Sequence, residues 1–507
     1  MDNNGNRQSH ARRRPESITS GTSRTGQGSR ARTDGAKHSS AASERRTSGG
    51  APSTITRNTA YTRNNNNIQS GRGRTNERHT QLTPAEERAI EREEKRLVRA
   101  ERRYLKEERR EAEWQKDIIR VRGGVDKFLL GIILILLVLG SITVFSSSYP
   151  LAIKEGHSSF TFIIDQLKFI GFGVLAFLLT FFFPIKAYKT WVPPFVYAVA
   201  SIMLVAALFI GTKEGVTTRW LDLGPINVQP SEVMKVSLIL MIAWYVEHRE
   251  EQMQDLTKGF DSFWWNTAVP DIIVGVACVL VLIGKHLSGT IIVGAIGVSL
   301  LVVAGCRIKW LLATILPAGA VAIAIFLVNN KYALERITSF QNENADKLDE
   351  LYQTTQSVYA IGSGGIFGVG LGASRQKYSY LGAAHTDFIF SIWCEEMGFV
   401  GAVLLIVLFI LFVWRGYVIA LRAPDKYTML TAFGITTHIG LQAFLNMCVA
   451  SDLIMNTGVT LPFFSYGGSA LVITLAEMGI LLKISRRFYR KKEDIEHDEM
   501  ARRAGLL

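Results

Sequence analysis

One carboxylate, Asp387, occupies a position where an ionised side chain could take part in chemistry. It lies in the run His385-Thr386-Asp387-Phe388, where a polar, glycine-rich loop gives way to a long apolar segment. An ionisable group at the edge of a membrane segment is costly to desolvate, so it is a functional candidate. Asp387 could act as a general base toward a hydroxyl, or hold a divalent cation that neutralises a diphosphate. It could also cap the following helix, as could Thr386.

A glycine-rich stretch precedes this carboxylate and ends in two cations. Six glycines fall within residues 362–372, and Ser374, Arg375, Gln376 and Lys377 follow them. Glycine allows close backbone approach and positive φ, so its amides can point at an anion, while Arg375 and Lys377 supply charge for a phosphate. Glycines can equally serve tight helix packing in a membrane. The residues alone leave both interpretations open.

Other charged residues lie within or beside apolar segments. Glu395 follows Asp387 by eight residues, which places the two near one face of a helix, whereas Glu396 points elsewhere. Acids at such depth need partners in the interior of a helix bundle. Glu232 and Lys235 are three residues apart and can pair. Such a pair is more often structural than catalytic.

Ten apolar segments must position these residues. They are 128–145, 170–183, 194–210, 233–246, 268–283, 289–305, 311–328, 388–413, 430–449 and 471–482. Each approaches or reaches the length of a membrane-spanning helix once its weakly polar flanks are included. We therefore predict an all-α integral membrane protein with about ten transmembrane helices. The largest extracytoplasmic loop would connect the seventh helix to the eighth.

Lysine and arginine predict how these helices are oriented. They gather before the first segment, after the second, sixth and eighth segments, and after the last one. Because cytoplasmic loops carry the excess of basic residues, both termini should be cytoplasmic. Three long connections, 211–231, 329–386 and 451–468, should then share the outer side. The net charge of +13 follows mainly from this topology and from attraction to anionic lipids, so we expect no nucleic-acid partner.

Composition divides the chain into four parts. Residues 1–82 are rich in Ser, Thr, Asn, Gly and Arg and cannot bury a core, which predicts a disordered basic cytoplasmic tail. In residues 83–124 opposite charges recur at helical spacing, which predicts a charged cytoplasmic helix. Residues 125–490 would form the ten-helix membrane domain, and residues 491–507 a cytoplasmic C-terminal tail.

Six short motifs follow one another along the membrane domain. They are Arg219-Trp220-Leu221-Asp222, Gln229-Pro230-Ser231-Glu232 with Lys235, Tyr352-Gln353 with Gln356-Ser357, Ala360-Ile361-Gly362-Ser363-Gly364-Gly365, His385-Thr386-Asp387-Phe388 with Glu395-Glu396, and Leu461-Pro462-Phe463-Phe464-Ser465-Tyr466-Gly467-Gly468. Each is short, but the ordered set on ten predicted spans is highly specific. Over roughly residues 125–490 the chain resembles the SEDS family (shape, elongation, division and sporulation).

The resemblance implies a peptidoglycan glycosyltransferase that polymerises lipid II at the outer face of the bacterial cytoplasmic membrane. The family's catalytic aspartate corresponds to Asp387, which would also be the residue that binds a divalent cation, Mg²⁺ or Mn²⁺. Implied partners are lipid II, the undecaprenyl-diphosphate-linked glycan, a class B penicillin-binding transpeptidase and other division proteins. The expected substrate-binding residues are Arg219, Trp220, Lys235, Gln356, Arg375, Lys377, His385 and Ser465.

Residues 370–377 look more like the division and sporulation branch than the elongation branch, which favours an FtsW-type enzyme at the septum. The chain departs from the family at 284–290 and 381–383, where acids common in the family are absent. Two alternative functions stay open. A lipid II flippase would need a polar path through the bundle, to which Glu395 or Asp452 could contribute. A weakly active division scaffold would instead act through the basic tail and the charged helix.

Overall fold

The structure is a computed structural model. It describes residues 118–491, apart from 215–216, 223, 225–226, 251–252, 254–262, 330–348, 379 and 457. The predicted tail of residues 1–82 lies outside the described residues, as do most of the predicted helix over 83–124 and residues 492–507.

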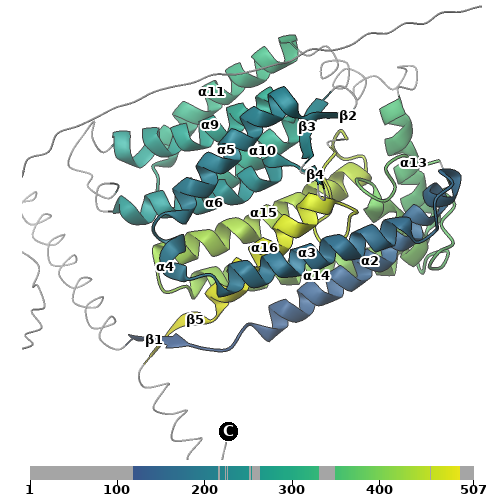
Figure 1. Ribbon diagram of the computed structural model, residues 1–507, viewed down its shortest axis with the longest axis horizontal. Coiled ribbons are helices and arrows are strands. Elements are labelled where there is room, and N and C mark those ends of the chain that lie inside the picture. The colour runs from purple at the N-terminus through teal and green to yellow at the C-terminus, as the bar shows by residue number, and fades with distance from the viewer. Residues whose placement is uncertain are drawn as a thin grey trace, which may run out of the picture. The chain divides into compact units, whose positions relative to one another are not determined.

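Helices occupy all ten segments predicted to span a membrane (Figure 1). Their bounds are α2 Lys127–Lys154, α3 Thr161–Phe182, α5 Val192–Ile210, α6 Pro230–His248, α9 Val269–Ile283, α10 Leu287–Val303, α11 Ile308–Asn329, α14 Ile389–Leu421, α15 Lys426–Ala450 and α16 Gly468–Ser485. Within the described part of the chain, seven helices are long and apolar enough to cross a membrane; one of them is the π-helix η1, Trp264–Ala268, continued by α9. These features confirm the prediction of an all-α multi-pass membrane protein.

Polar content decides which helices lie inside the bundle. Among the seven long apolar helices, α15 and α16 are the least apolar and the most buried, whereas α3 is the least buried. Because lipid tails are as apolar as leucine, purely apolar helices gain little by leaving lipid, but polar side chains must face other helices. The same reason explains why α6, which carries Glu232 and Lys235, is buried along most of its length between α5, α10 and α15.

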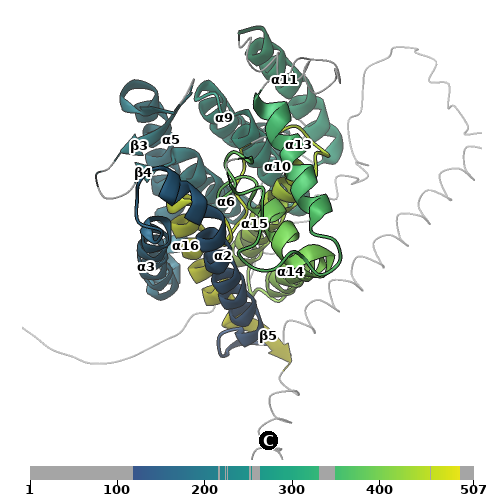
Figure 2. The same cartoon turned by 90° about the vertical axis from the view of Figure 1, so that its right-hand side faces the viewer.

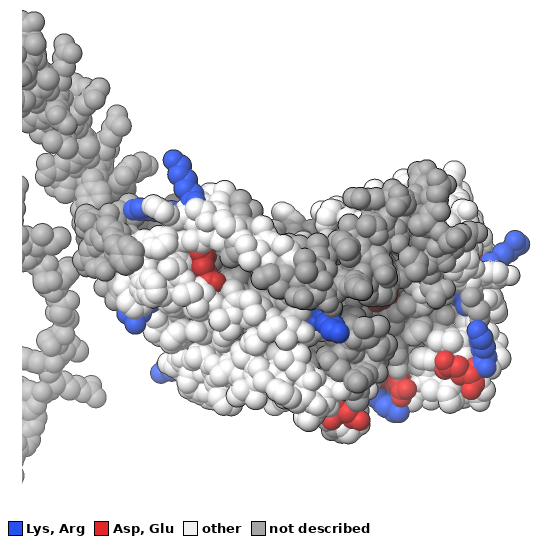
Figure 3. Space-filling view, turned by 90° about the horizontal axis from the view of Figure 1, so that it is seen from above, with Lys and Arg blue, Asp and Glu red and all other residues white. Residues whose placement is uncertain are grey.

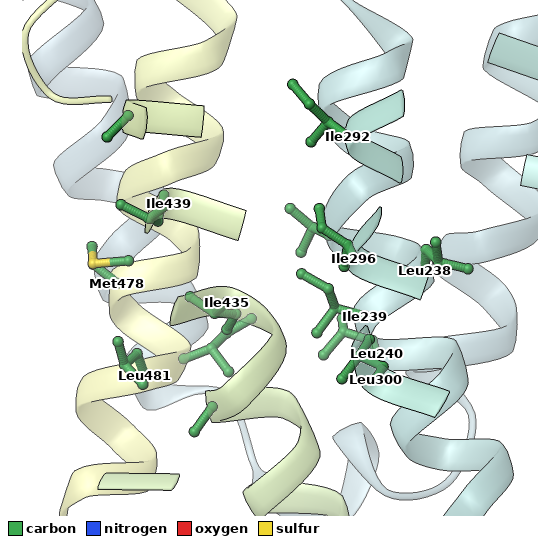
Figure 4. Packing of buried hydrophobic residues seen from close by; sticks show 14 of the residues in the cluster. Leu238, Ile239, Leu240, Ile292, Ile296, Leu300, Ile435, Ile439, Met478 and Leu481 are labelled. Atoms are coloured by element: carbon green, nitrogen blue, oxygen red, sulfur yellow. The ribbon is translucent and has the colours of Figure 1, made fainter. Parts of the chain in front are cut away.

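Apolar side chains fill the space between these central helices. Figure 4 shows isoleucine, leucine and methionine side chains from α6, α10, α15 and α16 packed at the centre, among them Leu238, Ile296, Ile439 and Met478. Outside, described charged residues are sparse across the middle of the face seen in Figure 3. A largely uncharged middle suits contact with lipid.

Small elements cover the two ends of the bundle (Figure 1). Strands β2 (Thr212–Glu214), β3 (Thr217–Asp222) and β4 (Asn227–Val228) form an antiparallel sheet in the order β2-β3-β4. This sheet lies at the same end as α13 (Asp349–Ser363), while α4 (Ile185–Tyr188) lies at the opposite end. The described parts of connections 211–231 and 329–386 therefore lie at one end of the bundle. Connection 451–468 meets the second of them, because Tyr466 N–H donates to His385 O at 2.9 Å.

The structure corrects the predicted helix over residues 83–124 at its last residues, which form a strand. Ile118–Arg122 form strand β1, which pairs antiparallel with β5, Arg487–Lys491. Three of the five residues in β1 are β-branched and alternate in part with arginine, which suits a strand. The partner strand is more than 360 residues away in the sequence, so helical charge spacing upstream gave no sign of it.

Helix α14 is broken at Gly398, where φ is +66° and ψ is −167°. A break inside a membrane helix frees backbone groups that must find other partners. The glycine-rich stretch supplies those partners with its own backbone. The four bonds are Val369 N–H to Glu395 O (3.0 Å), Gly370 N–H to Glu396 O (3.0 Å), Phe399 N–H to Gly365 O (2.9 Å) and Val400 N–H to Ile366 O (3.1 Å).

Candidate active site

Asp387 lies in a turn that ends where α14 begins, and its side chain is half-buried. The N-cap residue of α14 is Phe388, which has no side-chain oxygen to offer, so neither Thr386 nor Asp387 occupies the capping position. The hydroxyl of Thr386 donates to the carbonyl of Ala383 at 3.2 Å. The capping alternative considered for these two residues is therefore not what the structure shows.

Three consecutive backbone carbonyls of this turn each accept a hydrogen bond from a distant part of the chain. The bonds are Tyr466 N–H to His385 O (2.9 Å), Ser465 Oγ–H to Thr386 O (2.6 Å) and Asn446 Nδ2–H to Asp387 O (2.8 Å). A backbone held at three successive residues has little freedom to rotate. The direction in which Asp387 points is therefore set by α15 and by the loop of residues 458–467.

The carboxylate of Asp387 lies beside that same loop. Gly458 has φ +64°, and a Cβ atom built there would be 3.7 Å from Asp387 Oδ2. A glycine suits this position because φ near +60° strains other residues. Glycine also leaves the space beside the carboxylate without a side chain, which a substrate hydroxyl could use.

His385 sits next to the carboxylate in sequence and is packed between aromatic rings. Its ring centroid is 5.3 Å from that of Phe162 and 5.6 Å from that of Tyr466. Burial lowers the pKa of His385 below its ordinary value of 6.5, and the charge of Glu155 offsets this only in part. The imidazole is therefore neutral at pH 7, so it can hydrogen-bond to a substrate but offers no fixed positive charge to a diphosphate.

Lys377 is buried and engaged inside the protein, which does not favour its predicted contact with a phosphate. The side chain is buried, and its three ammonium protons go to Glu396 Oε1 (2.8 Å), Ser146 Oγ (2.9 Å) and the carbonyl of Gly372 (2.7 Å). Ser146 also donates to Glu396 Oε1 at 2.6 Å. A lysine has only three donors, and all are used. Lys377 therefore joins α2, α14 and the glycine-rich stretch.

The neighbouring Arg375 has the opposite environment. Its side chain is exposed, while its backbone N–H donates to Glu395 Oε1 at 2.9 Å. Glu395 also accepts from the hydroxyl of Ser374 and from Gln376 N–H. Glu395 thus fixes the turn that presents Arg375. Of the two cations predicted to bind a phosphate, Arg375 is the one whose side chain the structure leaves accessible.

The glycines before this turn serve close packing. A Cβ atom on Gly364 would collide with the carbonyl oxygen of Cys394, and one on Gly368 with that of Glu396. The backbone N–H groups of Gly368 and Gly370 donate to carbonyl oxygens at 2.9 and 3.0 Å instead of pointing at an anion. The structure thus favours the packing interpretation over a phosphate cradle.

Lys235 and Ser465 also lie in the interior, which does not favour their predicted contact with substrate. Lys235 is 2% exposed, and its ammonium pairs with Glu232 Oε2 at 2.7 Å and donates to Gln442 Oε1 at 2.7 Å. The hydroxyl of Ser465 accepts from Leu461 N–H at 2.7 Å while it donates to the Asp387 turn. The polar groups of both side chains are therefore engaged by other parts of the chain.

The remaining predicted substrate residues occupy the same end of the bundle. Arg219 and Trp220 lie in β3, where Trp220 is opposite Thr212 of β2. Gln356 lies on α13 and is half-buried. The start of α6 is tied to the start of α16 there, because Gln229 N–H donates to Ser469 Oγ at 3.2 Å. For Arg219, Trp220 and Gln356, contact with substrate stays a prediction.

Sequence reasoning missed a group of buried polar residues. His438, Gln442 and Asn446 lie on α15, Glu477 lies on α16, and all four are at most 2% exposed. A signal was present, since the three residues on α15 recur every fourth position in a predicted span, a spacing that puts them on one helix face. We call His438, Gln442 and Asn446 the α15 polar face.

Metal binding was predicted at Asp387. Among the described residues there is no group of three or more His, Cys, Asp or Glu side chains that could hold an ion. Within the described ranges, the side chains therefore form no ready-made cation cage. One carboxylate together with substrate phosphates is nevertheless a common arrangement for Mg²⁺, and the half-buried Asp387 fits that single role.

Comparison with known proteins gives a consistent match. Residues 127–490 match the FtsW/RodA/SpoVE family model, described as a cell cycle protein family. The stage V sporulation protein E of Bacillus subtilis is 37% identical over 368 residues, covering 71% of this chain and 97% of that protein. A probable peptidoglycan glycosyltransferase FtsW of Geobacter sp. strain M18 is 36% identical over 373 residues, covering 72% of this chain and 97% of that protein.

A solved structure, described as showing structural coordination of polymerization and crosslinking by a peptidoglycan synthase complex, has a similar fold. Its TM-score is 0.58 at 25% sequence identity, and the match covers 71% of this chain and 98% of that one.

Proposed function

The chain belongs to the FtsW/RodA/SpoVE family and by that membership is a peptidoglycan glycosyltransferase; we propose that it polymerises lipid II into glycan strands. The reaction would take place at the outer face of the cytoplasmic membrane during septal wall synthesis. One observation carries the assignment of its catalytic residue. The half-buried carboxylate of Asp387 extends from a turn whose carbonyls are fixed by three separate donors, beside Gly458, which has no side chain.

In the proposed reaction Asp387 takes the proton of the acceptor sugar hydroxyl. The hydroxyl oxygen then bonds to the anomeric carbon of the lipid-linked strand, and the bond from that carbon to the diphosphate oxygen breaks. Undecaprenyl diphosphate leaves, with inversion at the anomeric carbon. A single dominant carboxylate suits direct displacement, because a covalent route needs a second one about 5 Å away.

Charge develops on the leaving diphosphate. The exposed guanidinium of Arg375 would meet it, with Arg219 of β3 as a second cation. His385 would contribute a neutral hydrogen bond, and Trp220 and Gln356 would contact the sugar. A divalent cation, Mg²⁺ or Mn²⁺, would be held by Asp387 together with the substrate phosphates and would neutralise charge on the diphosphate.

We also propose a class B penicillin-binding transpeptidase as partner. The similar solved structure, which comes from a complex that couples polymerization to crosslinking, supports this assignment. The proposed orientation has both termini in the cytoplasm. Support comes from Lys186, Arg422 and Lys483, which fall near the bundle end that carries α4, β1 and β5.

A lipid II flippase stays a second candidate because polar side chains do lie inside the bundle. The contacts of Glu395 do not favour it as part of a path, since its carboxylate is engaged by Ser374, Arg375 and Gln376. The pairs Glu232–Lys235 and His438–Glu477 are the better candidates for a polar path. A flippase would move lipid II across a bilayer and release no polymer.

Replacement of the carboxylate tests the assignment directly. We expect Asp387→Asn to lower the rate of polymerisation by about 100-fold or more, because the amide keeps the shape but cannot accept the proton. The assay uses purified protein with and without the transpeptidase, lipid II and a divalent cation, and measures glycan strands on gels. Equal polymer from wild type and Asp387→Asn would refute a catalytic Asp387. Lipid II translocation in proteoliposomes without any polymer would favour the flippase.

A further inference from the structure

We propose that the α15 polar face positions Asp387, with Asn446 as the residue that joins the two loops around the carboxylate. Neither Asn446 nor Gln442 is placed to react with substrate, since both are buried inside the bundle. Their action would pass through the backbone that they hold. The proposal deepens the proposed function and rests on it for its effect on turnover.

Asn446 donates the two protons of its side-chain amide to two different loops. One goes to the carbonyl of Asp387 at 2.8 Å and the other to the carbonyl of Val459 at 2.7 Å. The Oδ1 atom of Asn446 is buried without a hydrogen-bond partner among the described residues. An unpaired buried acceptor is destabilising, so an asparagine here is a poor choice unless its two donated bonds matter.

Gln442, one turn earlier on α15, holds the next residue of the same loop. Its Nε2 donates to the carbonyl of Thr460 at 3.1 Å, while its Oε1 accepts from Lys235 Nζ at 2.7 Å. A carbonyl can only accept and an ammonium can only donate, so these two contacts fix which end of the amide is which. Gln442 is therefore locked in one orientation.

His438 connects Gln442 to Glu477 of α16 by hydrogen bonds. Its Nε2 lies 2.9 Å from Gln442 Oε1 and must donate, because that oxygen only accepts. Its Nδ1 lies 2.9 Å from Glu477 Oε1, so a proton must also lie between this nitrogen and the carboxylate. The shared proton keeps the pair neutral overall, as the Glu232–Lys235 pair is, which suits a buried position.

The result is a rigid helix face that sets the distance between two loops. The turn of Asp387 is tied at its carbonyl, and the opposing loop is tied at Val459 and Thr460, next to Gly458. These two segments border the Asp387 carboxylate. We call this arrangement, in which the α15 polar face holds both loops, the clamp. Misplacement of a reacting group by about 1 Å can lower the rate by about 100-fold. Loss of the clamp should therefore lower turnover more than substrate affinity.

The principal variant is Asn446→Asp, which keeps the shape but removes both amide donors. We expect kcat to fall by about 10- to 100-fold while KM for lipid II changes by less than about 3-fold. Thr436→Val is the matched control, because Thr436 is buried on the same helix and its hydroxyl donates only to Ala432 O of its own helix at 2.7 Å. The control should keep both constants near those of wild type.

A second variant covers the case in which Asn446→Asp does not fold. Ser465→Ala removes one small hydroxyl, and with it the bond to Thr386 O. Positioning predicts a several-fold lower kcat at unchanged KM, whereas direct contact with substrate predicts a higher KM. An unchanged kcat in folded Asn446→Asp would overturn the proposal, and so would a rise in KM without a fall in kcat in Ser465→Ala.

Hydrogen exchange of the full-length protein in detergent separates this inference from the proposed function. In Asn446→Asp the backbone amides of residues 381–388 and 458–467 should exchange faster, while those of α10 should not change. Unchanged exchange in both loops would overturn the clamp whatever the activity. Faster exchange together with an Asp387→Asn variant as active as wild type would keep the clamp and refute the catalytic role of Asp387.

Discussion

At the scale of single residues, Lys377 and Arg375 show how two cations close together in sequence acquire different environments. Lys377 is buried against Glu396 in an ion pair of 2.8 Å, whereas the side chain of Arg375 is exposed two residues earlier. An ammonium paired inside the protein compensates the charge of its buried partner, whereas a guanidinium on the surface is accessible to a ligand. Replacement of Lys377 should therefore lower stability, whereas replacement of Arg375 should weaken substrate binding.

We expect Lys377→Met to lower the free energy of unfolding by about 3–5 kcal/mol, because the variant leaves Glu396 as a buried, uncompensated charge. Thermal unfolding in detergent measures this loss. The double variant Lys377→Met/Glu396→Gln should regain most of it. Arg375→Gln should unfold like wild type but show a higher KM for lipid II. If Lys377→Met unfolds like wild type and only its KM rises, Lys377 contacts the substrate after all.

At the scale of elements, the break in α14 joins the glycine-rich stretch to the part of the helix that follows Asp387. Four backbone hydrogen bonds cross between residues 365–370 and residues 395–400, as a short piece of sheet would do. Glu395 and Glu396 add their side chains on the same side of the break. The turn of Arg375 and the start of α14 should therefore move as one unit.

Gly398→Ala tests this unit. At φ +66° and ψ −167° the backbone conformation is almost restricted to glycine, and the new Cβ would collide with Gly368 N. We expect a loss of about 1–3 kcal/mol from the backbone alone, with more from the collision. Gly362→Ala is the control, because Gly362 has open space around its Cβ position. Equal thermal stability of the two variants would show that the break is not needed.

At the scale of the whole molecule, the bundle places its least apolar helices at the centre and leaves the apolar ones to face lipid. The helices α6, α15 and α16 carry buried polar residues such as Lys235, His438 and Glu477, and all three lead to the end where Asp387 lies. At the other end β1 and β5 join the segments that enter and leave the bundle. Figure 2 shows α6 and α15 surrounded by the other helices.

Two truncations separate catalysis from scaffolding. Removal of residues 1–117 should leave polymerisation in detergent within about 2-fold of wild type, because β1 and every residue that we place at the site remain. Removal of residues 1–122 also deletes β1 and leaves β5 unpaired, so this variant should unfold at a lower temperature. Loss of polymerisation with the shorter deletion would favour a role for the tail in the reaction itself.

Composition along the chain was enough to locate ten helical segments and the carboxylate at the edge of the eighth. Long apolar runs can form only helices in a bilayer, so their positions follow from local composition. The order of six motifs identified the family, which the matches confirm. Local composition likewise indicated that the long connections lie at one end of the bundle.

Only the tertiary structure decided which polar residues face each other. Lys377, Lys235 and Ser465 carry groups that suit a substrate, yet each is used by a partner from a distant helix or loop. Asn446 is 59 residues from Asp387 along the chain, and no spacing rule joins them. Whether a polar group is open or engaged depends on contacts between segments far apart in sequence, and those contacts exist only after the bundle has packed.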